Sequence, residues 1–166
     1  MNVAVVGANG RVGTEICLIL KKRGVTVIPI VRNKIGSLFL QKQGLCCRIA
    51  DASNENDAKR ALLEADVGVI TAYMWTNLAI SAKENEKVNR KLVENSIAFA
   101  KNDAKVIYLS TIRSFSSTVD RQLSWFNFKP AYDTEKKKLE LLVRHASRKY
   151  KKRGYVFRLG HVFGEQ

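Results

Sequence analysis

Near its N-terminus the chain reads Asn2-Val3-Ala4-Val5-Val6-Gly7-Ala8-Asn9-Gly10-Arg11-Val12-Gly13-Thr14-Glu15. Residues 3–6 are apolar and mostly β-branched, which indicates a strand buried on both faces of a parallel sheet. Glycines then recur at every third position, and a helical pattern opens at Thr14. A strand, a glycine-rich turn and a helix in this order form the context in which such glycines bind a dinucleotide. The segment therefore predicts a nucleotide site at the first turn, with an ordinary glycine-rich turn as the alternative.

The three glycines have different expected roles. Gly7 allows the positive φ of a tight turn, Gly10 lets a pyrophosphate approach the backbone, and Gly13 lets the helix pack close to the strand. The pyrophosphate would lie on the unpaired N–H groups of the first helical turn, where the helix dipole is positive.

The rest of the chain alternates between strand and helix patterns. Strands are predicted at 3–6, 25–31, 45–50, 67–72, 105–109 and 155–159, and helices from Thr14 and at 37–43, 57–64, 83–100 and 131–152. Pro29 inside the second strand predicts a bulge or a locally frayed edge. The alternation predicts a single α/β domain over residues 1–166, a Rossmann-type doubly wound parallel sheet of about six strands in order 3-2-1-4-5-6 with helices on both faces.

Composition narrows the class of protein. The chain has 166 residues, 46% hydrophobic and 27% charged, which is typical of a globular domain. It contains no apolar run near 18 residues and no signal peptide, so we expect a cytoplasmic protein without a membrane span. Cys17, Cys46 and Cys47 are expected to be buried free thiols. No metal site is predicted, because His145 and His161 lie far from these cysteines in the sequence.

The net charge of +14 suggests an anionic partner. Its basic clusters fall mostly at the C-terminal ends of predicted helices, where cations favour the dipole, and they alternate with glutamates. This pattern favours small anionic molecules over nucleic acid, which is kept as a weaker alternative.

Two arginines bear on the choice of cofactor. An NAD-specific site has an acidic residue after the second strand, but this chain has Arg32 there. Arg32 and Arg11 could instead pair with a 2′-phosphate, which favours NADP(H), with NAD as the second choice. The alternative is that both arginines are simply solvated.

A candidate catalytic pair opens the last long helix. Tyr132 and Lys136 are four residues apart and so project from one helix face. An ammonium near a phenol lowers the phenol's pKa from its ordinary value of about 10, which permits proton transfer near neutral pH. Ser110 or Thr111, after the fifth strand, could donate a hydrogen bond to a substrate carbonyl or alkoxide. The alternative is a surface helix pair with no catalytic role.

In these motifs the sequence resembles the short-chain dehydrogenase/reductases, in particular the extended and atypical branches that include nucleotide-sugar epimerases and dehydratases. The family's Gly-x-x-Gly-x-x-Gly matches residues 7–13, its Tyr-x-x-x-Lys matches 132–136, its fourth-helix asparagine matches Asn89, and its acid after strand three matches Asp51. Residues 158–164 resemble the family's segment after strand six. The resemblance implies that Tyr132 is the acid/base, that Lys136 binds the nicotinamide ribose, and that Thr111 or Ser110 polarises the reacting C–O bond.

Together these arguments predict an NADP(H)-dependent oxidoreductase or an epimerase/dehydratase-like enzyme acting on a small molecule, such as a nucleotide sugar or another anionic carbonyl or alcohol compound. The predicted catalytic residues are Tyr132, Lys136, Thr111, Ser110 and Asn89. The predicted cofactor residues are Gly7, Asn9, Gly10, Arg11, Val12, Gly13, Arg32, Asp51, Ala52, Ala72 and Lys136.

Departures from the family keep other interpretations open. Family members usually continue well past this point into a substrate-binding part, and Leu159 and His161 replace the family's proline and asparagine. The chain is therefore a fragment of a longer enzyme, a compact enzyme whose substrate loop is 115–130, or a non-catalytic NAD(P)-binding sensor or scaffold. The family also implies a possible homodimer through the helices 83–100 and 131–152.

Overall fold

The computed structural model of the chain describes residues 1–74, 81–115 and 130–160. It contains one parallel sheet of six strands in the order β3-β2-β1-β4-β5-β6. The strands are β1 (Asn2–Val6), β2 (Thr26–Val31), β3 (Arg48–Ile49), β4 (Val67–Ile70), β5 (Lys105–Thr111) and β6 (Arg153–Leu159). The helices are α1 (Arg11–Lys22), α2 (Lys34–Lys42), α3 (Glu55–Leu62), α4 (Ala82–Ala98), the short 3₁₀ helix η1 (Ile112–Phe115) and α5 (Pro130–Lys149). The predicted fold class and strand order are confirmed.

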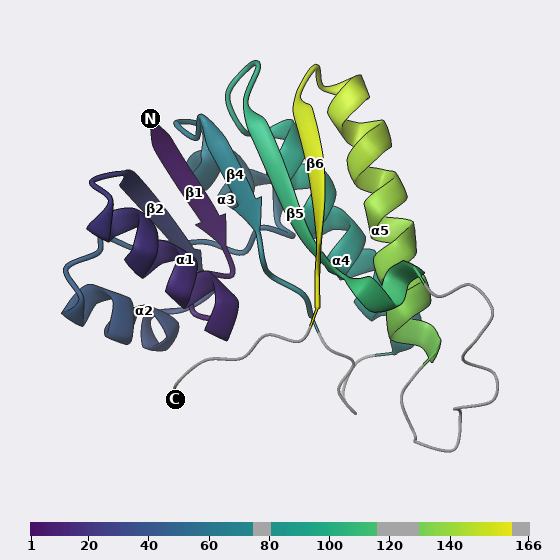
Figure 1. Cartoon of the computed structure of the whole chain (residues 1–166), viewed down its shortest axis with the longest axis horizontal. Helices are drawn as coiled ribbons and strands as arrows, with labels where there is room; N and C mark the ends of the chain where they lie inside the picture. Colours follow the sequence, from purple (N-terminus) through teal and green to yellow (C-terminus); the bar gives the residue numbers. More distant parts are fainter. Residues whose placement is uncertain (75–80, 116–129, 161–166) are drawn as a thin grey trace.

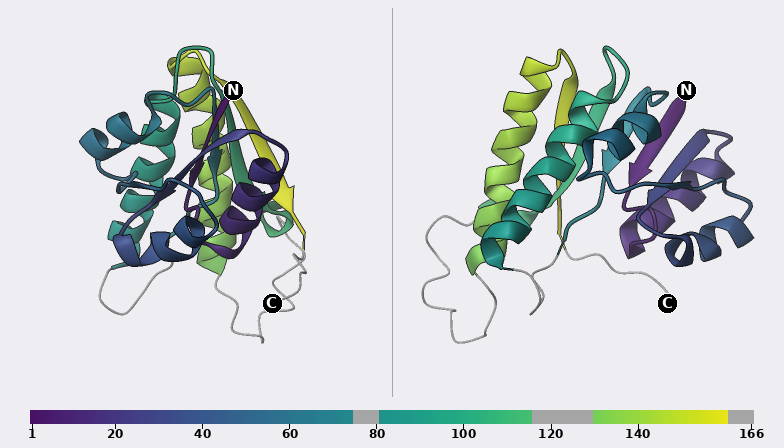
Figure 2. Two further views of the ribbon diagram at one scale, coloured as in Figure 1. Left: turned by 90° about the vertical axis from the view of Figure 1, so that its left-hand side faces the viewer. Right: turned by 180° about the vertical axis from the view of Figure 1, so that it is seen from behind.

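Helices cover both faces of the sheet, as Figures 1 and 2 show. On one face, Cys17 of α1 and Leu40 of α2 pack against Val3 and Val5 of β1. On the other face, α3, α4 and α5 pack over the even-numbered residues of the strands, including Ala4 and Val6. Because β1 is covered on both sides, all its residues from Val3 on are buried, and this explains its continuous apolar pattern.

The third strand is shorter than predicted. Only Arg48 and Ile49 pair with β2, whereas the prediction was 45–50. The reason lies at the end of α2, where Gly44 takes a φ of 70° and the N–H of Leu45 donates to the carbonyl of Leu40. This helix-ending turn keeps residue 45 attached to α2, so the strand begins only after it.

Of the two outcomes expected at Pro29, a bulge or a locally frayed edge, the bulge is absent, because β2 pairs residue for residue with β1 through Pro29 and Val5. The edge is open at this residue on the other side, where β3 does not reach Pro29. The carbonyl of Ile30 accepts from Gly7 and Ala8 on the β1 side. Successive backbone groups alternate in direction, so Pro29 faces the β3 side. β3 pairs only with Ile30 and Val31, so no ladder hydrogen bond is lost at the proline.

The prediction of three buried thiols holds for Cys17 alone; Cys46 is exposed and Cys47 is partly exposed. Both belong to the turn between α2 and β3 rather than to a strand. No helix in the described ranges has the length and apolar character needed to cross a membrane.

Candidate cofactor and active site

A cavity of about 550 Å³ opens at the carboxyl ends of the strands, where β1 and β4 lie side by side although their crossover helices lie on opposite faces. In a doubly wound sheet this is the point at which ligands bind. Most of the predicted site residues line it together. These are Gly7, Asn9, Gly10, Val12, Arg32, Asp51, Ala52, Ala72, Ser110, Thr111, Tyr132 and Lys136.

Three predicted residues do not line the cavity. Arg11 is exposed on the first turn of α1, away from the lining. Gly13 lies beneath the turn, and Asn89 is buried behind the cavity wall. Gly13 and Asn89 therefore contact the residues around the cavity and not the cavity itself.

The glycine turn is as tightly packed as its sequence suggests. Gly7 has a φ of 83°, and a Cβ there would lie 2.8 Å from Ala72 on β4's carboxyl side. A Cβ on Gly13 would lie only 2.3 Å from the carbonyl oxygen of Gly7. At Gly10 such a Cβ would lie 3.3 Å from that same oxygen, and Gly10 itself lines the cavity. The structure thus requires glycine at Gly7 for the turn and at Gly13 for helix packing, whereas a side chain at Gly10 would be less crowded.

The N-terminus of α1 differs from its neighbours. Asn33, Asn54 and Ser81 each cap their helix with a side chain, whereas Gly10 offers none, and no acidic residue lies in the first turn of α1. The first N–H groups of α1 are therefore available to an anion, and the positive end of the helix dipole faces the cavity. This chemistry fits the pyrophosphate of a dinucleotide.

Where the cavity extends past the ends of β2 and β3, it is lined by a cation, Arg32, and by the loop that contains Asp51 and Ala52. Arg32 is exposed, and no ion pair is recorded for it within the described part of the chain. Asp51 accepts hydrogen bonds from the N–H and the hydroxyl of Ser53 at 2.9 and 2.7 Å. Asn95 of α4 donates to the carbonyls of Ala52 and Ser53 and anchors this loop to α4. Asp51 thus has an acceptor oxygen in a constrained position.

Lys136 is buried among aromatic rings at the opposite end of the cavity. Its Nζ lies 4.7 Å from the ring centre of Tyr73, 4.8 Å from that of Tyr108 and 5.8 Å from that of Tyr132. It donates to the carbonyl of Leu109 at 3.2 Å. Burial lowers the pKa of Lys136 from 10.5 to about 8, although nearby carboxylates partly oppose this shift. The residue can therefore hold or release a proton close to neutral pH.

Tyr132 stands edge-on to Tyr73, with ring centres 5.0 Å apart. Tyr73 follows β4, and its hydroxyl donates to Glu135 at 2.6 Å. Burial, together with this bond to a carboxylate, raises the pKa of Tyr73. The Glu135 carboxylate thus keeps the Tyr73 phenol neutral. Tyr132 lies one helical turn from the Lys136 ammonium, as the Tyr-x-x-x-Lys spacing requires.

Asn89 and Glu135 join α4, α5 and the segment after β4. The side-chain amide of Asn89 donates to Glu135 at 2.8 Å, and its oxygen accepts from the N–H of Met74 at 2.7 Å. Asn85 and Asn89, one turn apart on α4, both donate to the carbonyl of Met74. Asn89 therefore positions the segment that carries Tyr73 and does not reach the cavity.

Tyr73, which lines the cavity, and Glu135, which binds its hydroxyl, were not among the predicted residues. Glu135 lies inside the Tyr-x-x-x-Lys motif, and the i, i+4 pair of asparagines on α4 was a visible sign of a buried polar network. The side chains of the aromatic residues in 115–130 lie outside the part of the chain that the structure describes. So does the segment 161–166, which includes His161.

Comparisons with known proteins agree with this geometry. A family model described as NAD(P)H-binding matches residues 7–151. No match to a curated protein sequence was found. Among solved structures, the UDP-N-acetylglucosamine 4-epimerase of Bacillus cereus is similar, with a TM-score of 0.73 and 20% identity over 100% of this chain and 62% of that chain.

Two further similar structures contain a bound nicotinamide cofactor. A short-chain dehydrogenase/reductase superfamily protein of Agrobacterium tumefaciens with bound NAD has a TM-score of 0.72 and 16% identity, over 95% of this chain and 48% of that chain. BdcA in complex with NADPH has a TM-score of 0.71 and 15% identity, over 95% of this chain and 69% of that chain. The chain thus spans about half to two thirds of the length of these proteins.

These identities show a shared fold, while the family model covers most of the sequence, including the glycine turn and the Tyr132–Lys136 pair. The chain belongs to the NAD(P)H-binding family and has the Rossmann fold of the short-chain dehydrogenase/reductases.

Proposed function

We propose that the chain is an NADP(H)-dependent oxidoreductase or a nucleotide-sugar epimerase or dehydratase, with a Ser/Thr-Tyr-Lys site. The observation that carries this proposal is a shared cavity. The glycine turn at one end and Thr111, Tyr132 and Lys136 at the other end line the same space of about 550 Å³. A dinucleotide with its pyrophosphate on α1 would extend from Arg32 toward Lys136.

The residues divide the chemistry between them. When bound, a nicotinamide cofactor supplies or accepts the hydride. Tyr132 would exchange a proton with the substrate oxygen, and the Lys136 ammonium would favour its phenolate and hold the nicotinamide ribose. Thr111, with Ser110 as the alternative, would donate a hydrogen bond to the same oxygen and stabilise the charge that develops there. The substrates named for the similar B. cereus epimerase make a nucleotide sugar the first substrate class to test.

Arg32 supports NADP(H) as the preferred cofactor. We expect Arg32→Ala to weaken NADPH binding about tenfold and to leave NADH binding nearly unchanged, because only NADPH has the 2′-phosphate that a guanidinium can pair with. Titrations followed by the fluorescence of the reduced nicotinamide measure both constants. Lys42→Ala, which removes an equal charge at the far end of α2, is the control. The proposal fails if the wild-type chain binds neither cofactor at millimolar concentration.

Tyr132 is tested by removing its proton and keeping its ring. On a panel of UDP-glucose, UDP-N-acetylglucosamine and small carbonyl compounds, we expect Tyr132→Phe to lower turnover by about a hundredfold or more. Tyr155→Phe, which changes an exposed tyrosine on β6, should have no effect. An active chain indifferent to Tyr132→Phe would contradict the proposed acid/base.

The second candidate is a non-catalytic NAD(P)-binding sensor or scaffold, or the cofactor-binding half of a longer enzyme. It is favoured by one observation, that the chain spans only 62% and 48% of the first two structures compared. This candidate predicts NADPH binding without turnover on the whole panel. A partner recovered by pull-down would support the scaffold in particular.

A further inference from the structure

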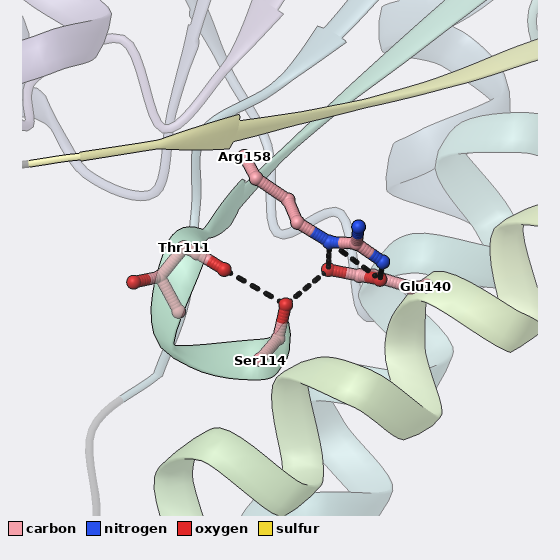
Figure 3. A network of polar contacts seen from close by, with 4 residues as sticks. All are labelled: Thr111, Ser114, Glu140 and Arg158. Carbon is pink, nitrogen blue, oxygen red and sulfur yellow. Dashed lines mark hydrogen bonds and ion pairs between the residues drawn. The ribbon is translucent and has the colours of Figure 1, made fainter. Parts of the chain in front are cut away.

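A buried polar network lies behind the end of β5 and joins it to α5 and β6 (Figure 3). At its centre is Glu140 of α5, which is 3% exposed. The guanidinium of Arg158 on β6 donates hydrogen bonds to both oxygens of this carboxylate, with Nε 3.0 Å from Oε1 and Nη2 2.6 Å from Oε2. Such a two-point pairing fixes orientation as well as distance.

Ser114 connects this ion pair to β5. Its hydroxyl oxygen lies 2.6 Å from Glu140 Oε1 and 2.7 Å from the carbonyl oxygen of Thr111. The hydroxyl has one hydrogen and so donates to one of these acceptors at a time. Ser114 belongs to η1, directly after β5, and it therefore places the last residue of the strand against α5.

A second contact from α5 reaches β5 just before this point. Lys136, one helical turn before Glu140, donates to the carbonyl of Leu109. Lys136 thus attaches α5 to β5 directly, just before Ser110. Glu140, one turn later, attaches it through Ser114, just after Ser110. Tyr132 precedes Lys136 by one more turn, so the same stripe of α5 carries the proposed acid/base and both attachments.

The charges of this stripe also act on each other. Burial alone would raise the pKa of Glu140, but hydrogen bonds from Arg158 and Ser114 hold it at about 2. Glu140 is therefore a carboxylate at neutral pH. The negative charges of Glu135 and Glu140 both raise the pKa of Lys136 and oppose the effect of burial on that ammonium.

We propose that Glu140 and Arg158 are positioning residues of the active site. Neither lines the cavity. Through Ser114 they hold the end of β5, so that the hydroxyl of Thr111 keeps its place beside the substrate oxygen with which Tyr132 exchanges a proton. The inference rests on the function proposed above, and it adds an ion pair and a serine to the residues that the Ser/Thr-Tyr-Lys motif contains.

The test compares Glu140→Gln and Ser114→Ala with a matched control. Glu86→Gln also neutralises a glutamate that is paired with α5, to Lys138, but on the exposed side of the helix. We expect both network variants to bind NADPH within about threefold of wild type and to lose about tenfold in kcat with little change in KM, because a displaced hydroxyl weakens only the transition state. The reaction is reduction by NADPH of the panel compound that the wild type turns over.

A second measurement follows Lys136 itself by NMR titration of its ammonium group. Glu140→Gln should lower the pKa of Lys136 below about 8, whereas Glu86→Gln should leave it unchanged. A merely structural role would lower the melting temperature without moving this titration. The proposal is overturned if kcat and the Lys136 titration are the same in Glu140→Gln as in wild type, or if the control has the same effects. If Glu140→Gln fails to fold, Ser114→Ala decides on kcat alone.

Failure of the proposed function is recognised separately. It shows as a wild-type chain that does not bind NADPH, or that binds it and turns over no compound of the panel. In that case hydrogen exchange at the amides of Ser110 and Thr111 still tests the attachment. Faster exchange in Glu140→Gln than in Glu86→Gln supports it, and equal exchange overturns it.

Discussion

At the scale of single residues, Gly13 is the position where one methyl group should matter most. A Cβ there would lie 2.3 Å from the Gly7 carbonyl and 2.9 Å from the Thr71 hydroxyl, so α1 would have to move away from β1. We expect Gly13→Ala to lower the free energy of unfolding by about 1–3 kcal/mol and to weaken NADPH binding. Urea denaturation measures the first effect. Gly68→Ala is the control, since a Cβ there meets only Val106 at 4.0 Å, and a variant at Gly13 as stable as this control would contradict the close packing.

The buried Lys136 makes stability depend on pH in a defined window. Its pKa is about 8 in the folded chain and near 10.5 when unfolded, so between these values the unfolded chain binds more protons. The contribution of Lys136 to the free energy of unfolding should therefore rise with pH from about 8 to 10.5, by about 3 kcal/mol at most, and should not change with pH below that range, where the buried ammonium destabilises the fold by a constant amount. Lys136→Met should remove this rise and Lys137→Met, on the exposed side, should keep it. Parallel curves for both variants would show that Lys136 is not the group responsible.

At the scale of elements, Glu135 joins three segments that are far apart in the sequence. Its two oxygens accept from Tyr73, after β4, and from Asn89 of α4, while its own backbone belongs to α5. Glutamine is uncharged and has one acceptor oxygen, so Glu135→Gln replaces two charge-assisted hydrogen bonds with weaker neutral ones and reverses the bond to the Tyr73 hydroxyl, in a half-buried place. We expect a loss of about 1–3 kcal/mol of stability, measured by urea denaturation.

Glu86→Gln provides the comparison for this change. Glu86 pairs with Lys138 between the same two helices, but its side chain is 47% exposed, so its loss should cost less than about 1 kcal/mol. If the two variants are equally stable, the link through Glu135 does not hold the helices as described.

At the scale of the whole molecule, charge bears on the homodimer that the family resemblance implies through α4 and α5. The structure shows Glu86 and Glu94 paired with Lys138 and Lys149 of their own chain, so a partner's lysines would have to compete with these pairs. The other exposed cations of these helices form no ion pair with the residues that the structure describes. They are Lys83, Lys87, Arg90, Lys91, Lys137, Arg144 and Arg148. Two copies facing each other here would place like charges together.

We therefore expect a dimer through these helices to be weakest at low salt and to strengthen between about 0.05 and 0.5 M, where screening becomes effective. Sedimentation equilibrium measures the association constant. Arg90→Glu should favour the dimer at low salt, whereas Lys42→Glu on α2 should not. Dimerisation that weakens with salt would exclude this surface as the interface.

Local sequence patterns were sufficient for the fold and for much of the site. The apolar run of β1, the glycine spacing and the alternation of strands with helices predict the strand order, because parallel crossovers have one hand and short connections. They also place Gly10, Arg32, Ala72 and Ser110 after the carboxyl ends of strands, where the cavity is found. Their catalytic and cofactor roles stay predictions until the variants are measured.

The sequence by itself determined the sheet, its order and the turn with an uncapped helix behind it, since these depend on backbone preferences and on the periodicity of neighbouring residues. Only the tertiary structure decided that β3 has two residues, that Asn89 lies behind the cavity wall, and that Glu140 meets Arg158. The physical reason is that these features arise from contacts between segments that dock after they form. A buried carboxylate takes whichever donors the packing of helices and strands brings to it, and no spacing along the chain specifies them.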